Sequence, residues 1–97
     1  MAKYKVRSKV VVWPGEQGAW HFAYVDAKNA DAIKKKCGKS KRGFGAIRVT
    51  VTLGKSKWQT SIFPDKHSGT YLLPIKKQIR VAESIDAGDT VSFTLTI

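Results

Sequence analysis

The sequence predicts a mainly β chain of about six strands and two short helices, folded as one domain over residues 1–97. Three observations support this prediction. Several segments alternate apolar and polar residues with the period of a half-buried strand. A strand–helix–strand pattern occurs twice along the chain. The 97 residues, of which 42% are hydrophobic, suffice for one modest core without disulfides or metals.

The N-terminal segment predicts two strands joined by a loop. Residues Lys3–Val10 alternate cations with mostly apolar groups, which on a strand places four cations on one face. Trp13–Gly18 contains Pro and Gly residues that interrupt strand pairing, so a loop is expected there. Trp20–Val25 alternates again and predicts the second strand.

A first helix is expected after Asp26, whose side chain suits an N-cap. Three lysines fall in its last turn, where cations complement the helix dipole, and Gly38 marks its end. One face of this helix is apolar and is expected to be buried, with Cys37 as a small core residue: Ala30, Ile33 and Cys37.

The middle of the chain predicts a hairpin. Ile47–Leu53 alternates well, Gly54–Ser56 suits a turn, and a further strand is expected from Trp58 to about Phe63. Pro64–Gly69 is expected to be a loop.

The last third predicts a second strand–helix–strand unit. Tyr71–Leu73 is a short apolar strand, and Pro74 suits the first turn of a helix. Asp86–Asp89 predicts a turn, and Thr90–Ile97 alternates as a half-buried strand. The buried face of the helix is expected to carry Ile75, Ile79 and Ala82.

The two units form a weak internal repeat, in which Trp20–Leu53 corresponds to Tyr71–Ile97 and Asp26 stands where Pro74 stands in the second unit. A true repeat would build a pseudo-symmetric barrel from one chain, and a closed barrel would remove exposed strand edges. The copies share pattern more than identity, so chance similarity is the alternative.

Charge is the strongest compositional feature, because the chain has 18 Lys and Arg residues but only 7 Asp and Glu residues, which gives a net charge of +11. Residues 1–43 hold eleven of the bases and three of the acids. Such asymmetry favours an anionic partner such as nucleic acid, an acidic protein or a membrane surface. A basic, well-solvated surface that only keeps the protein soluble is the alternative.

Two cationic segments are the candidate anion-binding sites, the first predicted strand and the stretch from the end of the first helix into the following loop. The second segment holds six cations and no acid within nine residues. Either segment suits phosphate binding, and the alternative for both is a solvated face. The candidate residues are Lys3, Lys5, Arg7, Lys9, Lys34, Lys35, Lys36, Lys39, Lys41 and Arg42.

Catalytic and metal-binding patterns are weak, so a non-enzymatic protein without a cofactor is expected. His67 lies near Asp65, Ser61 and Ser68, but no nucleophile motif surrounds them. The two histidines and the single cysteine match no metal-ligand spacing. The Gly43–Gly45 segment precedes a strand and lacks a following Lys-Ser/Thr, so a turn is expected in place of a phosphate loop.

The sequence shows no signal peptide and no long apolar run, so a cytoplasmic protein without membrane insertion is expected. The three tryptophans are expected in the core or at its rim. An exposed tryptophan beside cations would instead suit stacking on single-stranded bases. The three are Trp13, Trp20 and Trp58.

From about Tyr4 to Ile97 the chain resembles the bacterial domain of unknown function 1905 family. The most specific motifs lie in the second half: Ser61–Lys66, Gly69–Arg80 and Gly88–Val91. Family features along the chain are Trp20, Gly43–Val49, Phe63-Pro64-Asp65, Leu73–Lys77 and Gly88-Asp89. Relatives often have Pro where this chain has Asp26, and either residue suits a helix start. The resemblance implies a small split β-barrel and brings no established activity.

The second unit is also similar, at the level of fold only, to the half-barrels of AbrB-type transcription factors and antitoxins, which dimerise to bind DNA. Three functional hypotheses follow. The first is a basic binding module for an anionic polymer, most plausibly nucleic acid. The second is a structural or protein-interaction domain without nucleic-acid binding. The third is a small-ligand site in the barrel mouth near Trp58, Phe63 and Tyr71.

Overall fold

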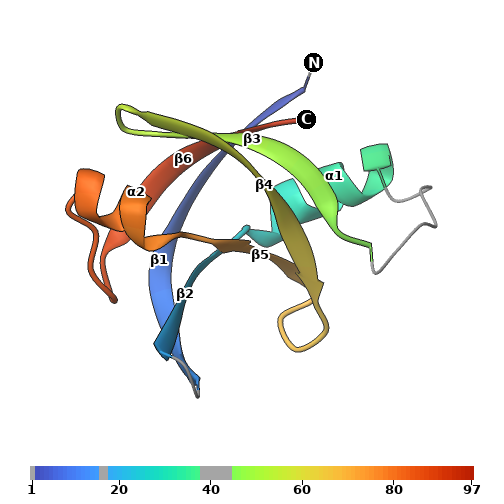
Figure 1. Cartoon of the computed structure of the whole chain (residues 1–97). Coiled ribbons are helices and arrows are strands. Elements are labelled where there is room, and N and C mark those ends of the chain that lie inside the picture. Colours follow the sequence, from blue (N-terminus) through green and yellow to red (C-terminus); the bar gives the residue numbers. More distant parts are fainter. Residues whose placement is uncertain (1, 16–17, 38–44) are drawn as a thin grey trace.

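Antiparallel strands close into one barrel in the computed structural model, which describes residues 2–15, 18–37 and 45–97 (Figure 1). The six strands of this part are β1 (Lys3–Gly15), β2 (Gly18–Tyr24), β3 (Ile47–Leu53), β4 (Ser56–Asp65), β5 (Thr70–Pro74) and β6 (Thr90–Thr96). Its two helices are α1 (Ala27–Cys37) and α2 (Lys77–Ala82). The mainly β fold class predicted from the sequence is therefore confirmed.

The strand order around the barrel is β1-β2-β5-β4-β3-β6, and every neighbouring pair is antiparallel. If β1 is exchanged with β4, β2 with β5 and β3 with β6, every strand keeps the same neighbours around the closed barrel. The first strands of the two predicted units, β2 and β5, pair with each other, and so do their last strands, β3 and β6. The topology is therefore that of two interlocked halves, as an internal duplication requires.

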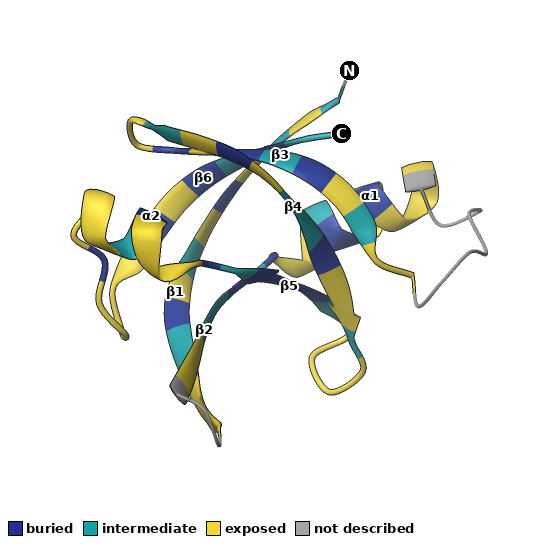
Figure 2. Ribbon diagram, in the orientation of Figure 1, coloured by how far each residue is buried: buried dark blue, intermediate teal, exposed yellow. Residues whose placement is uncertain are grey.

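The core combines the inward-facing residues of the alternating strands with apolar residues of the two helices and of the segments beside them. Figure 2 shows the buried positions along the strands in dark blue. On β6, Val91, Phe93 and Leu95 are buried, while the residues between them are exposed or half-buried. β3 buries Val49, Val51 and Leu53 in the same way. The period-two prediction is confirmed for both strands, and a one-residue slip would exchange the inward and outward sets.

Helix α1 begins at its predicted cap, because the backbone N–H of Asn29 donates to Asp26 Oδ2 at 3.1 Å. The side chain of Asn29 also donates to the carbonyl of Lys5 at 2.7 Å and so ties the helix to β1. Ala30 and Ile33 are buried as predicted. The side chain of Cys37, predicted to share this face, lies outside the described residues.

The predicted start of the second helix at Pro74 is wrong. Pro74 ends β5 and pairs with Phe22, and the next residue, Ile75, still donates its N–H to the carbonyl of His21. This continued pairing with β2 holds the chain extended until α2 begins at Lys77. Ile75 and Ile79 are buried, but the predicted inward residue Ala82 is exposed. Ile75 precedes the helix, so the seven-residue spacing from Ile75 to Ala82 is not a helical spacing.

The predicted loop at Trp13–Gly18 begins later than expected. β1 runs on to Gly15, and Trp13 pairs with Trp20 across the hairpin. Packing between the aromatic rings of β1 and β2 favours pairing that the Pro and Gly residues alone would disfavour. β4 likewise extends to Asp65, where it pairs with Thr70, so the predicted loop after Phe63 is shorter.

We expect the protein to be a monomer, because one chain supplies both halves of the barrel and all the strands that close it. Light scattering at micromolar concentration measures this directly. A stable dimer in which strands are exchanged between chains would contradict the argument from the internal repeat.

Candidate functional site

The outer face of the sheet formed by β1, β6, β3 and β4 carries polar and cationic side chains. The same alternation that buries the core directs the other half of each strand outward. Over Lys3–Val10 of β1 the exposed residues are all cations, and on β6 the exposed residues are Thr and Ser. The outward set is Lys3, Lys5, Arg7, Lys9, Arg48, Thr50, Thr52, Lys57, Gln59, Ser61, Thr90, Ser92, Thr94 and Thr96.

Strand register aligns these side chains in rows across the four strands. One row is Lys5–Thr94–Thr52–Lys57, with a cation at each end and two threonines between them. The next row is Lys3–Thr96–Thr50–Gln59. Neighbouring strands lie about 4.8 Å apart, so the backbones of the two lysines of the first row are separated by about 14 Å measured along the curved sheet.

Both rows line one shallow hollow of about 690 Å³ on the surface, into which Lys3, Lys5 and Lys57 contribute their side chains. A second hollow of about 410 Å³ shares Lys5 with the first and adds Arg7. The two hollows adjoin on the polar face, since Lys5, Thr52 and Thr94 line both. We call this surface the cationic sheet face, meaning the outward residues of β1, β6, β3 and β4 given above.

The cationic sheet face contains no carboxylate among its described residues. The ion pair seen in the described part of the chain lies elsewhere, on α1, where Lys35 Nζ is 3.3 Å from Asp31 Oδ2. None of the cations of the face forms an ion pair with an acid of the described residues, and the threonine and serine hydroxyls between them are hydrogen-bond donors. This arrangement suits an anion with several oxygens.

The structure brings together only part of the predicted anion-binding set. The first group, Lys3, Lys5, Arg7 and Lys9, lies on the exposed side of β1 as predicted. Lys34, Lys35 and Lys36 are exposed in the last turn of α1, and Lys34 lines a different hollow from Lys3 and Lys5. The remaining predictions, Lys39, Lys41 and Arg42, lie outside the described residues.

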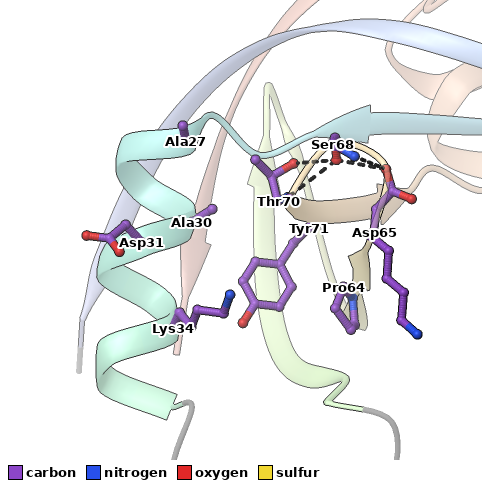
Figure 3. Close-up of a pocket in the computed structure, with 11 residues that line it drawn as sticks. Ala27, Ala30, Asp31, Lys34, Pro64, Asp65, Ser68, Thr70 and Tyr71 are labelled. Atoms are coloured by element: carbon purple, nitrogen blue, oxygen red, sulfur yellow. Dashed lines mark hydrogen bonds between the residues drawn. The ribbon is translucent and has the colours of Figure 1, made fainter.

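The hollow at α1 has about 380 Å³ and lies between the helix and the β4–β5 turn (Figure 3). Acid and base are balanced there, with Asp31 and Asp65 beside Lys34 and Lys66. Ser68 donates its hydroxyl to Asp65 Oδ2 at 2.7 Å, and this bond lowers the pKa of Asp65 below its ordinary value. The bond is part of a local turn.

The candidate Ser–His–Asp set is therefore not assembled as a triad. The Ser68 hydroxyl is bonded to Asp65 and to Thr70 Oγ1 rather than to a histidine. His21 instead lies near α2, where Arg80 Nη1 is 3.2 Å from its Nε2. Among the described residues no three His, Cys, Asp or Glu side chains are placed to hold one metal ion.

The tryptophans divide between core and surface. Trp58 is buried at 9% exposure, whereas Trp13 and Trp20 are 42% and 62% exposed. Both exposed rings contact Phe22, with centroid distances of 5.1 Å from Trp13 and 6.3 Å from Trp20. We call Trp13, Phe22 and Trp20 the aromatic cluster; it lies on the outside of the β1–β2 hairpin.

The proposed barrel-mouth site is not formed as expected. Trp58 and Tyr71 are buried and line different hollows, and Phe63, at 45% exposure, points to the surface of β4. Phe63 pairs with Leu72 across the strands instead.

A sequence profile described as Domain of unknown function (DUF1905) matches residues 7–95. The chain belongs to the DUF1905 family. The match extends over both interlocked halves of the barrel, and it confirms the resemblance found in the sequence. No curated protein matches the chain.

Two cations of the DUF1905 cationic sheet face were missed by the sequence analysis. Lys57 on β4 and Arg48 on β3 both lie on the outward side of alternating strands. Their alternation is visible in the sequence, but nothing local indicates that β4 lies in the same sheet as β1. The described residues of this DUF1905 domain include no helix of the length and hydrophobicity needed to cross a membrane.

Proposed function

We propose that this DUF1905 domain is a non-enzymatic, cytoplasmic module that binds nucleic acid through its cationic sheet face. The observation that supports the proposal is the hollow lined by Lys3, Lys5 and Lys57, with hydroxyls between the cations and no carboxylate among the outward residues of the face. A polyanion neutralises such a surface and releases its own condensed counterions, which favours binding without base recognition.

The side chains of the face are those that contact phosphates in nucleic-acid complexes. Lys and Arg supply charge, and Thr, Ser and Gln donate hydrogen bonds that position the backbone. The rows run across four strands, about 14 Å measured along the curved sheet, and so suit an extended polymer better than a single small anion. The net charge of +11 adds long-range attraction.

The alternative function is a protein-interaction domain whose basic surface serves solubility alone. The exposed aromatic cluster, with Trp20 at 62% exposure, is the observation that favours it, since exposed aromatic residues are frequent at protein interfaces. The two functions differ in one measurable respect, which is the affinity for nucleic acid of random sequence.

We expect the domain to bind random-sequence oligonucleotides with an affinity that falls as salt rises. Fluorescence anisotropy with labelled single strands and duplexes, between about 50 and 300 mM salt, measures the dependence. The log of the binding constant is expected to change with the log of salt by about −0.9 per phosphate contacted on duplex, or about −0.7 on single strands. No binding at about 50 mM salt would contradict the proposal and favour the protein-interaction domain.

A further inference from the structure

The outward side of β1 changes character along its length. From the N-terminus it carries Lys3, Lys5, Arg7 and Lys9, and it then continues through Val11 to Trp13. At about 3.3 Å per residue, the stripe from Lys3 to Trp13 is about 33 Å long. One strand thus joins the cationic sheet face to the aromatic cluster without a carboxylate on its outward side.

The aromatic cluster presents ring surface to solvent. Trp13 pairs with Trp20 across the hairpin, and the ring of Trp20 is nearly parallel to that of Phe22, at an interplanar angle of 11°. Phe22 contacts both indoles, while 42% of Trp13 and 62% of Trp20 remain exposed. Rings held by their neighbours but open on the outside can accept a further stacked ring with little loss of conformational entropy.

Cations lie on either side of the cluster. Lys9 is on the same outward side of β1 as Trp13, four residues earlier. Trp20 lines a hollow of about 260 Å³ together with Lys76 and Arg80. A partner lying on the indole rings therefore meets positive charge in both directions along the surface.

These observations favour an anionic partner that also carries flat rings. A second copy of the chain, with the same net charge of +11, would bring cations against cations at this surface. Single-stranded nucleic acid has phosphates for the lysines and unpaired bases for the indoles, whereas a duplex keeps the faces of its bases stacked on one another. A length of about 33 Å corresponds to about ten stacked nucleotides at about 3.4 Å each, within the range of roughly 4 to 16 that small barrels bind.

We propose that Trp13 and Trp20 stack on unpaired bases while the cations of β1 contact the backbone, so that the domain prefers single strands to duplexes. This inference rests on the proposed nucleic-acid binding and adds the class of nucleic acid and the stacking residues. Because every base has a ring face, little dependence on sequence is expected.

The test compares Trp13→Ala and Trp20→Ala with the wild type on a random single strand and on a duplex of equal length. Each variant is expected to weaken single-strand binding by about 5- to 150-fold, the loss that corresponds to one stacked base, with duplex binding changed by less than about twofold. Trp20→Phe keeps a ring and is expected to retain most of the affinity. Val81→Ala, which truncates another exposed apolar residue on α2, is the matched control and is expected to have no effect.

Fluorescence gives an independent readout, since bases stacked on Trp13 and Trp20 quench these exposed indoles. Single strands are expected to quench the wild-type emission strongly and duplexes weakly. Equal losses of single-strand and duplex affinity in Trp20→Ala, or no loss, would overturn the stacking inference. The proposed function would stand in that case if the wild type still bound nucleic acid in a salt-dependent way. A wild type that binds neither nucleic acid would overturn both. A wild-type dimer that Trp20→Ala converts to a monomer would assign the cluster to self-association.

Discussion

Replacing Phe93 by Ala is expected to lower the free energy of unfolding by about 3–5 kcal/mol, the range for removing a buried aromatic side chain. Phe93 is 3% exposed, belongs to the core cluster formed by the described residues, and pairs with Val6 on β1. β6 lies between β1 and β3, so a cavity at this position loosens both contacts at once. Urea unfolding monitored by circular dichroism measures the loss.

Phe63→Ala is the matched control, because Phe63 is also a strand phenylalanine but is 45% exposed. Its expected loss is at most about 1 kcal/mol, the scale of substitutions outside the core. A loss below about 1 kcal/mol for Phe93→Ala would show that β6 pairs in a register shifted by one residue. A loss above about 1 kcal/mol for the control would show the same for β4, the strand that carries Phe63.

Neutralising Lys3, Lys5 and Lys57 together, each to Gln, is expected to weaken binding to single strands on the order of 10²- to 10³-fold at about 50 mM salt. The estimate assumes that three phosphate contacts are lost. Each contact contributes about 0.7 to 0.9 to the slope of the log of the binding constant against the log of the salt concentration. The slope itself is expected to become shallower by about 2 to 3. The three lysines line one hollow and are exposed, so folding is expected to be unaffected.

The matched control neutralises Lys34, Lys35 and Lys36, which are exposed at the end of α1 and lie outside the cationic sheet face. Both triple variants carry the same net charge, so any difference between them reports position rather than total charge. We expect the helix variant to lose less than about tenfold. Equal losses would mean that the overall field dominates, and a greater loss in the helix variant would move the site to the segment that begins at α1.

The sequence by itself determined which residues of β1, β3 and β6 face inward. Period-two alternation is a local property, because successive side chains of any strand point to opposite sides. Val91, Phe93 and Leu95 were therefore assigned to the core before any partner strand was known, and the cations of β1 to the surface. Asp26 was identified as a cap for the same reason, since its hydrogen bond is to a residue three positions away.

Only the tertiary structure decided which outward residues share a surface. Lys5 and Lys57 are 52 positions apart, and they fall in one row because β6 and β3 separate β1 from β4 in the barrel. Strand order depends on long-range pairing, which no local pattern encodes. The continued pairing of Ile75 with β2 likewise overrode the helix signal of Pro74. The exposure of Trp20 was decided by the pairing of β2 with β1. This pairing sets the ring of Trp20 on the outside of the hairpin against Phe22 rather than in the core.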